Sequence, residues 1–213
     1  MRTKTTLLCL AALTAGVVSS MAQSNVYSLN IVGYVTQTNP VGYRIIANPL
    51  NATNNDVSSI FQNPPALLTI FKRNSSGTGY DSSTFDPDIP GWSAPMQVAP
   101  GTGVWIANPG PGVYVNTFVG EVVLNSTNAV PAGYSLKSSV IPQQGGIETA
   151  LLYPRGDLDT IFFFNGVGYD SFTYDPDVPG WTPSEPSPAV AQGFWIFNNG
   201  ASKNWVRNFS VGP

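Results

Sequence analysis

The chain has 213 residues, a formal net charge of −3, no histidine and one cysteine, Cys9. Because histidine is absent and Cys9 stands alone, a Ser-His-Asp triad, a Cys-His pair and the usual zinc ligand sets are excluded. Twelve acidic residues outnumber nine basic ones, so binding to nucleic acid, which needs clustered positive charge, is not expected.

The first 22 residues have the pattern of a secretory signal peptide. Arg2 and Lys4 give a basic start, residues 7–18 are apolar, and Ser20-Met21-Ala22 places small residues before a cut at Gln23. The apolar run is too short to cross a membrane; the alternative is a buried N-terminal helix. We therefore expect export to the periplasm, the cell surface or the medium, without a membrane span in the mature chain.

The rest of the chain is written twice. Residues 80–92 (YDSSTFDPDIPGW) and 169–181 (YDSFTYDPDVPGW) are identical at ten of thirteen positions. Other matched segments lie 89 to 91 residues apart, and the differences in length fall in Gly-, Ser- and Pro-rich stretches, as expected for loops. The sequence therefore predicts two tandem units, residues 23–123 and 124–213, joined near residues 113–124 without a long linker.

Both units are predicted to be all-β. The chain contains 21 glycines and 19 prolines, and only 10% of its residues are charged, so turns should be frequent and surface helices scarce. Short segments rich in β-branched and aromatic residues are the expected strands: 26–36, 43–47, 67–72, 80–85, 104–107, 113–123, 134–137, 160–164, 169–174, 194–197 and 205–211. One short helix per unit is expected, at 57–62 after the capping residues Asn55 and Asp56, and at 147–152.

Evenly spaced short strands favour a β-sandwich or a partly open barrel of about 90 residues in each unit. The alternative is one pseudo-twofold body in which the two halves share a core. The segment Ile161-Phe-Phe-Phe164 is apolar at every position, which predicts a strand with both faces covered.

Several phrases of this sequence resemble segments of exported proteins. They are GYRIIANPL at 42–50, APGTGVWIAN at 99–108, TFVGEV at 117–122 and VYSLNIVGY at 26–34. They resemble a group of secreted tandem-repeat proteins of Verrucomicrobia-type bacteria, and they are more distantly similar to the GWNLIGNP and PGQGFFV surface modules of Bacteroidetes. The resemblance implies a β-rich exported protein and carries over no catalytic residue.

Half of the acidic residues lie in the repeated phrase, and they are the candidate ligands of a metal ion: Asp81, Asp86, Asp88, Asp170, Asp175 and Asp177. Carboxylates at turns can hold calcium, but the spacing lacks the EF-hand register and its terminal glutamate. Asp-Pro-Asp followed by Pro-Gly is also turn chemistry, because Asp accepts backbone N–H bonds while Pro and Gly set the turn angles. We favour a scaffold turn, with calcium as the alternative and no other cofactor.

Tryptophans are the candidate contacts for a ligand, because an indole can stack on a flat apolar surface. Trp92 and Trp181 end the two repeated phrases, and Trp205, without a tryptophan partner in the first unit, is the best candidate for an exposed platform. Packing in the core is nevertheless the preferred interpretation for all three. Trp105 and Trp195 lie in apolar strands and are predicted to be buried.

No residue set in the sequence specifies a reaction. A glycosidase needs two carboxylates across a cleft, yet Glu121, Glu148 and Glu185 have no acidic counterpart in the other unit. We therefore expect a non-enzymatic protein with a structural or adhesive role at the cell surface or matrix, whose partners are extracellular polysaccharide or other surface proteins. A carbohydrate-binding module, with or without calcium, is the alternative, and a glycoside hydrolase is the least favoured interpretation.

Overall fold

The computed structural model describes residues 31–89, 91–178 and 180–210, and the predicted signal peptide lies outside them. Within this described part the chain is all-β, with fourteen strands and one short helix. None of the described residues belongs to a helix with the length and apolar character needed to cross a bilayer.

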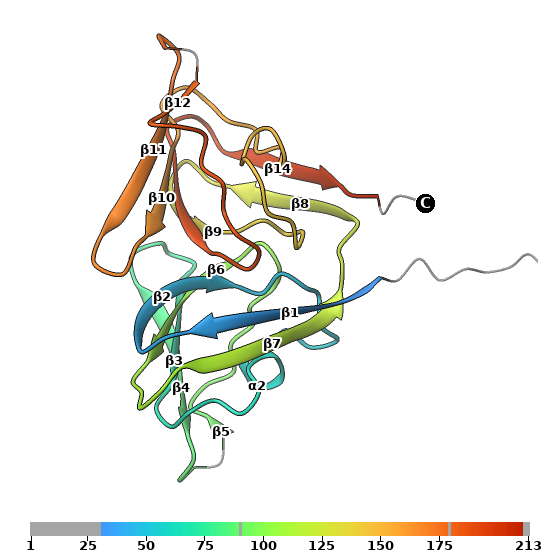
Figure 1. Ribbon diagram of the computed structural model, residues 1–213, viewed down its shortest axis with the longest axis vertical. Helices are drawn as coiled ribbons and strands as arrows, with labels where there is room; N and C mark the ends of the chain where they lie inside the picture. The colour runs from blue at the N-terminus through green and yellow to red at the C-terminus, as the bar shows by residue number, and fades with distance from the viewer. Residues whose placement is uncertain (1–30, 90, 179, 211–213) are drawn as a thin grey trace, which may run out of the picture. The chain divides into compact units, whose positions relative to one another are not determined.

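The first half of the described chain, residues 31–123, contains seven strands and the helix (Figure 1). They are β1 (Val32–Asn39), β2 (Gly42–Ala47), α2 (Val57–Ile60), β3 (Thr69–Arg73), β4 (Tyr80–Asp86), β5 (Gly91–Trp92), β6 (Gly103–Asn108) and β7 (Tyr114–Glu121). The second half, residues 124–210, contains the other seven strands. They are β8 (Asn125–Val130), β9 (Gly133–Lys137), β10 (Thr160–Phe164), β11 (Tyr169–Asp175), β12 (Gly180–Thr182), β13 (Phe194–Asn198) and β14 (Lys203–Asn208).

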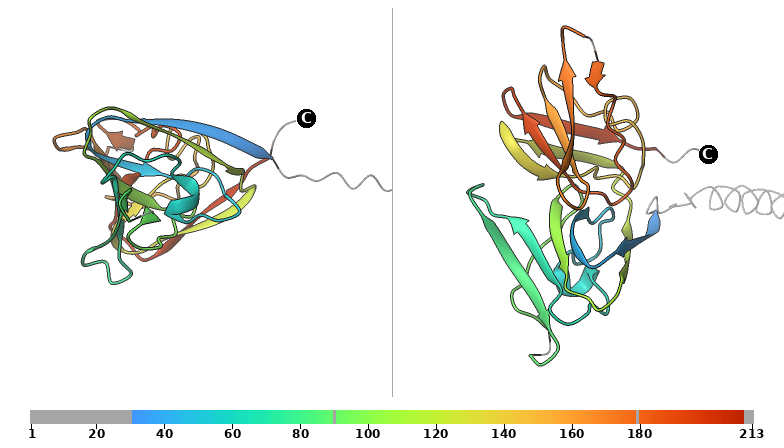
Figure 2. Two further views of the ribbon diagram at one scale, coloured as in Figure 1. Left: turned by 90° about the horizontal axis from the view of Figure 1, so that it is seen from below. Right: turned by 60° about the vertical axis from the view of Figure 1, so that its left-hand side comes forward.

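The duplicated sequence forms a duplicated topology. Each half has a five-stranded sheet, in the order β2-β6-β3-β4-β5 in the first half and β9-β13-β10-β11-β12 in the second. Each half also has a two-stranded ribbon, β1-β7 or β8-β14, and every strand pair is antiparallel. Figure 2 shows the matching β3–β4 and β10–β11 hairpins from two further sides.

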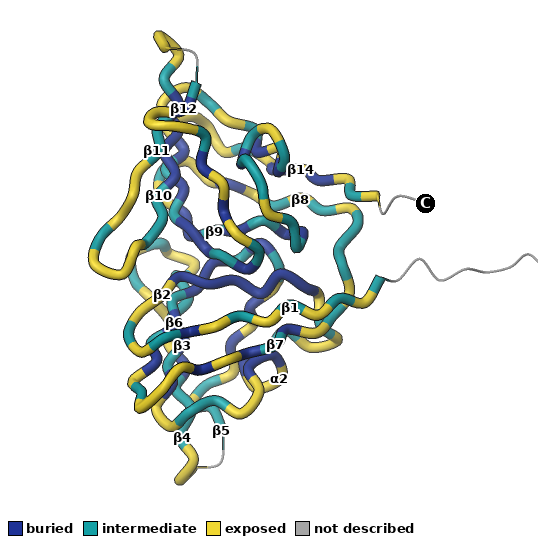
Figure 3. Tube along the Cα trace, viewed as in Figure 1, coloured by how far each residue is buried: buried dark blue, intermediate teal, exposed yellow. Residues whose placement is uncertain are grey.

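Each sheet packs one face against the ribbon of its own half. In the first half Ile70 and Ile106 from the sheet meet Phe118 from β7, and all three are at most 1% exposed. In the second half Ile161 from the sheet meets Trp205 from β14, and both are again at most 1% exposed. Exposed residues gather in the turns, including the tips between β4 and β5 and between β11 and β12 (Figure 3).

The helix predicted at 57–62 is present as the single turn α2. Asp56 caps it by accepting a hydrogen bond from the Ser58 backbone N–H at 3.0 Å. The second helix, predicted at 147–152, is wrong, because this segment forms a hydrogen-bonded turn instead. Gly145 and Gly146 precede this segment, where the first half has the capping residues Asn55 and Asp56. Glycine has no side chain that could cap a helix, and it disfavours the helical conformation.

Three strands were missed from the sequence, namely β5, β8 and β12. The largest of them, β8, reads NSTNAV and lacks the apolar and aromatic residues typical of strands. It forms because β14 pairs with it along its whole length. The joint predicted near residues 113–124 contains β7, and β8 follows it after three residues.

The contacts between the two halves come in equivalent pairs, because matching positions of the sequence repeat form them. One isolated bridge pairs Ile46 with Gln192, and the equivalent bridge pairs Lys137 with Thr102. Alongside, the Ala47 N–H donates to Ala191 at 2.9 Å, and Ala191 itself packs into the core of the first half. These contacts join both halves into one unit that begins at Ile31; whether either half folds alone remains a prediction.

Candidate functional site

The outer faces of the two five-stranded sheets, which are turned away from the cores, carry aromatic side chains. Successive side chains of a strand point to opposite faces of the sheet. Ile70 and Ile106 are buried in the core, so their chain neighbours Phe71 and Trp105 point to the outer face. Antiparallel pairing then places Phe71 opposite Trp105 in the first half and Phe162 opposite Trp195 in the second.

These aromatic residues line two matching hollows. The first, here named the Phe164 pocket, has a volume of about 400 Å³. It is lined by Tyr43, Phe71, Tyr80, Trp105 and Phe164. The second, here named the Arg73 pocket, has a volume of about 410 Å³. It is lined by Arg73, Tyr134, Phe162, Tyr169 and Trp195. Both volumes fall within the range of small-ligand sites.

Each pocket is completed by a residue from the other half. Arg73 ends β3 and Phe164 ends β10, and the two occupy the same position of the duplicated sequence. The Phe164 ring meets the Trp105 ring edge-on with centroids 4.8 Å apart, and the Arg73 guanidinium lies 4.9 Å from the Trp195 ring centroid. Both pockets therefore depend on the contact between the halves.

The aromatic geometry of the two pockets is nearly the same. Tyr43 stands at 80° to Trp105 with centroids 6.4 Å apart, and Tyr134 stands at 83° to Trp195 at 6.4 Å. These two tyrosines are 59% and 54% exposed. A cluster of large aromatic side chains that stays open to solvent on a sheet face is typical of a recognition surface.

The pockets adjoin one another, because Tyr169 of the Arg73 pocket packs against the Phe164 ring with centroids 5.6 Å apart. Burial raises the pKa of Tyr169, a hydrogen bond with Trp195 lowers it, and the neighbouring Tyr80 raises it further. Since Phe164 lines the other pocket, its contact with Tyr169 places the two sites side by side.

Trp205 is a core residue, as the preferred interpretation of the sequence had it, and not the exposed platform that was the alternative. It is 1% exposed, and its indole N–H donates to the Leu151 carbonyl at 2.7 Å. Its ring packs against Tyr153 with centroids 5.4 Å apart. It is buried because β14 turns this side chain toward the sheet rather than toward solvent, so it does not present a platform.

Trp181 and Trp92 also pack inward. Trp181 is 8% exposed, and its N–H donates to a Glu148 carboxylate oxygen at 2.9 Å. Trp92 is half-buried between Phe61 and Phe85, with ring centroids 5.9 Å away in both cases. All three tryptophans singled out from the sequence thus lie in or beside the cores, and none of them lines either pocket.

Trp105 and Trp195 were predicted to be buried, and this is wrong, because both are half-buried and line the pockets. The prediction that both faces of residues 161–164 are covered needs a similar correction. Ile161 faces the core, whereas Phe162 and Phe164 line the pockets. The sequence carried no local signal for this exposure, because every position of residues 161–164 is apolar and neither face is marked as open.

Two of the six repeated aspartates, Asp86 and Asp175, turn back onto their own backbone. Asp86 accepts a hydrogen bond from the Asp88 N–H at 2.9 Å, and Asp175 accepts one from the Asp177 N–H, also at 2.9 Å. The side chains of the other four, Asp81, Asp88, Asp170 and Asp177, are exposed. Within the described residues, no three acidic or other metal-ligating side chains gather at one point; calcium binding at these turns remains a hypothesis.

Two glutamates considered for hydrolysis are held by internal contacts. Glu148 pairs with the Arg155 guanidinium at 3.1 Å through one oxygen and accepts from Trp181 through the other. Glu185 accepts the backbone N–H groups of Glu148 and Thr149, both at 2.7 Å. The two carboxylates therefore fasten the turn at 147–152 rather than line a cleft.

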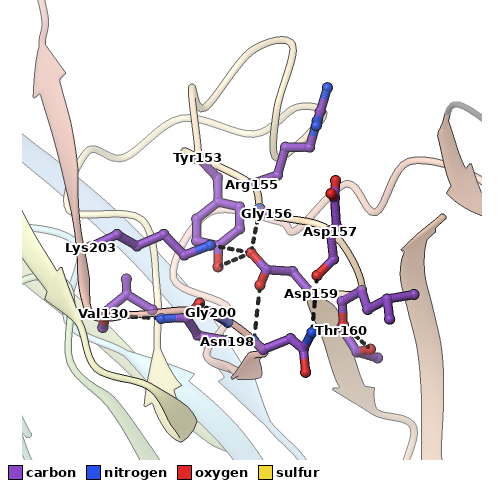
Figure 4. A network of polar contacts seen from close by, with 12 residues as sticks. Val130, Tyr153, Arg155, Gly156, Asp157, Asp159, Thr160, Asn198, Gly200 and Lys203 are labelled. Atoms are coloured by element: carbon purple, nitrogen blue, oxygen red, sulfur yellow. Dashed lines mark hydrogen bonds and ion pairs between the residues drawn. The ribbon is translucent and has the colours of Figure 1, made fainter. Parts of the chain in front are cut away.

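A second polar cluster surrounds the buried carboxylate of Asp159 (Figure 4). It accepts hydrogen bonds from the Tyr153 hydroxyl at 2.9 Å and from the Asn199 N–H at 3.1 Å, and it forms an ion pair with Lys203. Burial, together with Asp159, raises the pKa of Tyr153 far above its ordinary value. Because Asp159 is 0% exposed and fully bonded, the cluster is a structural network rather than a site open to ligand.

No family model matches the chain, and no curated protein or solved structure matches it significantly. The resemblance to secreted bacterial repeat proteins therefore stays a prediction. The twin pockets are the feature of the described residues from which a function can be inferred.

Proposed function

We propose that the protein is an exported, non-enzymatic adhesion protein that binds polysaccharide through its twin aromatic pockets. The observation that carries this proposal is that four matched aromatic residues form a wall of each pocket. The walls consist of Tyr43, Phe71, Tyr80 and Trp105 in the first half, and of Tyr134, Phe162, Tyr169 and Trp195 in the second. Two copies of a fold require two hydrophobic cores for stability. Stability does not require aromatic side chains in an open hollow on both sheets.

The pockets suit sugar rings. The faces of a pyranose are apolar, while its rim carries hydroxyl groups, and the pocket walls combine flat rings with the polar tips of two tyrosines each. Tyrosine and tryptophan also lose little conformational freedom on binding, because their side chains have few rotatable bonds. Such walls hold a ring by stacking and fix its orientation through the hydroxyls.

Binding without hydrolysis fits the lining. No carboxylate lines either of these two pockets, and a glycosidase requires two of them beside the bond that breaks. Two adjoining sites on one chain would engage a polymer at two points, and the second contact then forms at a high effective concentration. An adhesive role at the surface or matrix follows from such retention.

The test is retention on polysaccharide by affinity electrophoresis, with neutral and acidic polymers in the gel. We expect Trp105→Ala and Trp195→Ala each to weaken retention several-fold, since one aromatic contact contributes about 1 kcal/mol. The double variant should lose retention altogether. Because both side chains are half-buried outside the cores, the thermal unfolding midpoint should change little.

Tyr34→Ala is the matched control, because Tyr34 is an aromatic residue of β1 that is 73% exposed and lines neither pocket. Its retention should equal that of the unaltered protein. Retention of the double tryptophan variant at full strength, or no retention of the unaltered protein on any polymer, would refute polysaccharide binding by the pockets.

A further inference from the structure

The two pockets differ in charge. Their aromatic walls match position by position, but the residue that crosses from the other half is Arg73 in one pocket and Phe164 in the other. The Arg73 guanidinium is the one charged group among the residues that line these two pockets. The Arg73 pocket therefore combines a cation with an aromatic wall, whereas the Phe164 pocket is uncharged.

Arg73 is held in place without a carboxylate partner. Its Nη2 group donates to the Gly77 carbonyl at 2.6 Å, and its guanidinium lies against the Trp195 ring. Ion pairs in the described part of the chain join Arg155 to Glu148 and Lys203 to Asp159, and none involves Arg73. A guanidinium has five N–H donors, so the remaining ones can bind a planar anionic group in a bidentate manner.

Among the described residues, the surroundings of the Arg73 pocket contain no carboxylate that could neutralise the guanidinium. A neighbouring hollow of about 310 Å³ shares Arg73 with it and is also lined by Lys72 and Lys137, with no acidic residue in its lining. Asp81 pairs with Lys72 across the strands, and alternation places both on the face away from Arg73. Lys72 donates to the Gln97 carbonyl at 2.8 Å and Lys137 to the Asn128 side chain at 3.2 Å, so Arg73 is the cation of this hollow that faces the pocket.

The matching place beside the Phe164 pocket lacks this arrangement. The positions of Lys72, Arg73 and Lys137 are taken there by Phe163, Phe164 and Ile46. The hollow at that place contains one cation, Arg44, which does not line the Phe164 pocket itself. The two pockets therefore differ in charge, and a ligand group suited to one need not suit the other.

We infer that the Arg73 pocket binds a sugar ring that carries an anionic group, a carboxylate or a sulfate, while the Phe164 pocket binds a neutral ring. The ligand is then an acidic polysaccharide, with its charged residue stacked on Trp195 and its acid group on Arg73. This inference rests on the proposed function and assigns a substrate class to the same pockets.

The experiment exchanges the crossing residues. Arg73→Phe makes the Arg73 pocket resemble its partner, and Phe164→Arg introduces the charge into the other pocket. Binding is measured by affinity electrophoresis and calorimetry with three probes: polygalacturonate for carboxylates, dextran sulfate for sulfates and hydroxyethylcellulose as the neutral polymer. The unfolding midpoint of each variant is measured alongside, and Arg73→Gln takes the place of Arg73→Phe if the latter does not fold.

We expect Arg73→Phe to weaken binding of the preferred acidic polymer by about tenfold or more, because a hydrogen-bonded charge is lost. Binding of the neutral polymer should not weaken, because the altered pocket resembles the one that accepts a neutral ring. Phe164→Arg should tighten binding of the acidic polymer, and the control Arg44→Ala should leave it unaltered. In the unaltered protein, raising salt from about 50 mM to about 500 mM should weaken acidic binding, because salt screens exposed charges.

The polymer whose binding depends on Arg73 identifies the anionic group. Equal binding of acidic polymer by the unaltered protein and Arg73→Phe overturns the inference, as does binding of the neutral polymer alone. The proposed function survives both results as long as the double tryptophan variant loses retention. Absence of binding to all three polymers contradicts the proposed function together with the inference.

Discussion

Leu68 and Asp159 occupy the same position of the duplicated sequence, and both are 0% exposed. In the first half the position holds an apolar core residue. In the second half it holds a carboxylate, which is tolerated because Tyr153, Gly156, Asn199 and Lys203 all donate to it. Burial of a charge demands such complete partnering, since an unpaired one is strongly unfavourable.

This network makes Asp159→Asn the substitution with the largest predicted effect on stability. The amide would leave the Lys203 ammonium without its counter-charge in a partly buried setting, so the free energy of unfolding should fall by about 3–5 kcal/mol. Urea unfolding followed by tryptophan fluorescence measures it. Asp157→Asn is the control, because Asp157 is exposed, and it should stay within about 0.5 kcal/mol of the unaltered protein.

A second pair of equivalent positions shows how one residue can alter a site without altering the fold. Arg73 and Phe164 both end a hairpin strand and both cross to the other half. The fold accommodates both side chains at this position, and in the proposed function the choice between a cation and a ring decides what each pocket binds.

Among the elements, the turns between β4 and β5 and between β11 and β12 explain the repeated phrase. Asp86 and Asp175 each accept the N–H group two residues further along, which closes the turn locally. Trp92 and Trp181 then follow in the short strands β5 and β12 and pack inward. The phrase is repeated because both turns use the same chemistry.

We therefore expect Asp86→Ala and Asp175→Ala each to lower the free energy of unfolding by about 1 kcal/mol, the net contribution of one such hydrogen bond. The effect should be the same with calcium and with a chelator, because the lost interaction is with the backbone. Thermal unfolding in both solutions checks this. A midpoint that rises with calcium in the unaltered protein and not in the variants would instead establish the turns as a metal site.

For the whole molecule, the joint between the halves decides whether the pockets exist. Gly103 and Gly193 occupy one position of the duplicated sequence, and each lies against the backbone of the other half. A Cβ at Gly193 would lie 2.6 Å from the Ile46 carbonyl oxygen, and one at Gly103 would lie 2.9 Å from that of Lys137. Only glycine allows so close an approach of the two sheets.

Gly193→Ala should accordingly push the halves apart. We expect it to lower the free energy of unfolding by about 1–3 kcal/mol, as overpacking does, and to weaken polysaccharide retention because Arg73 and Phe164 would move from their pockets. Gly168→Ala is the control, since a Cβ there meets nothing within 4 Å. Unaltered stability of Gly193→Ala would show that the joint does not bring the halves this close.

Much of the fold could be predicted from the sequence, because its local signals are strong. Turn residues mark the ends of segments such as 160–164, and β-branched and aromatic residues identify them as strands, which the structure confirms. The duplication likewise predicted that both halves repeat one set of elements. The strand β8 was not predicted, because its polar residues carry no such signal. It is a strand because it pairs with β14.

The aromatic residues of the pockets were visible in the sequence, but their exposure was not. Val104-Trp105-Ile106 reads as a uniformly apolar strand, and nothing local tells which face is covered. Burial depends on what packs against each face, and that partner comes from distant parts of the chain. The crossing of Arg73 and Phe164 is harder still, because each residue acts in the half to which it does not belong.

The sequence by itself determined the all-β class, the repeated strand pattern and the chemistry of the turns, since all of these depend on neighbouring residues. The tertiary structure alone decided which aromatic residues are open to a ligand and which half supplies the fifth residue of each pocket. The physical reason is that exposure and proximity arise only when the two sheets pack against their ribbons and against each other.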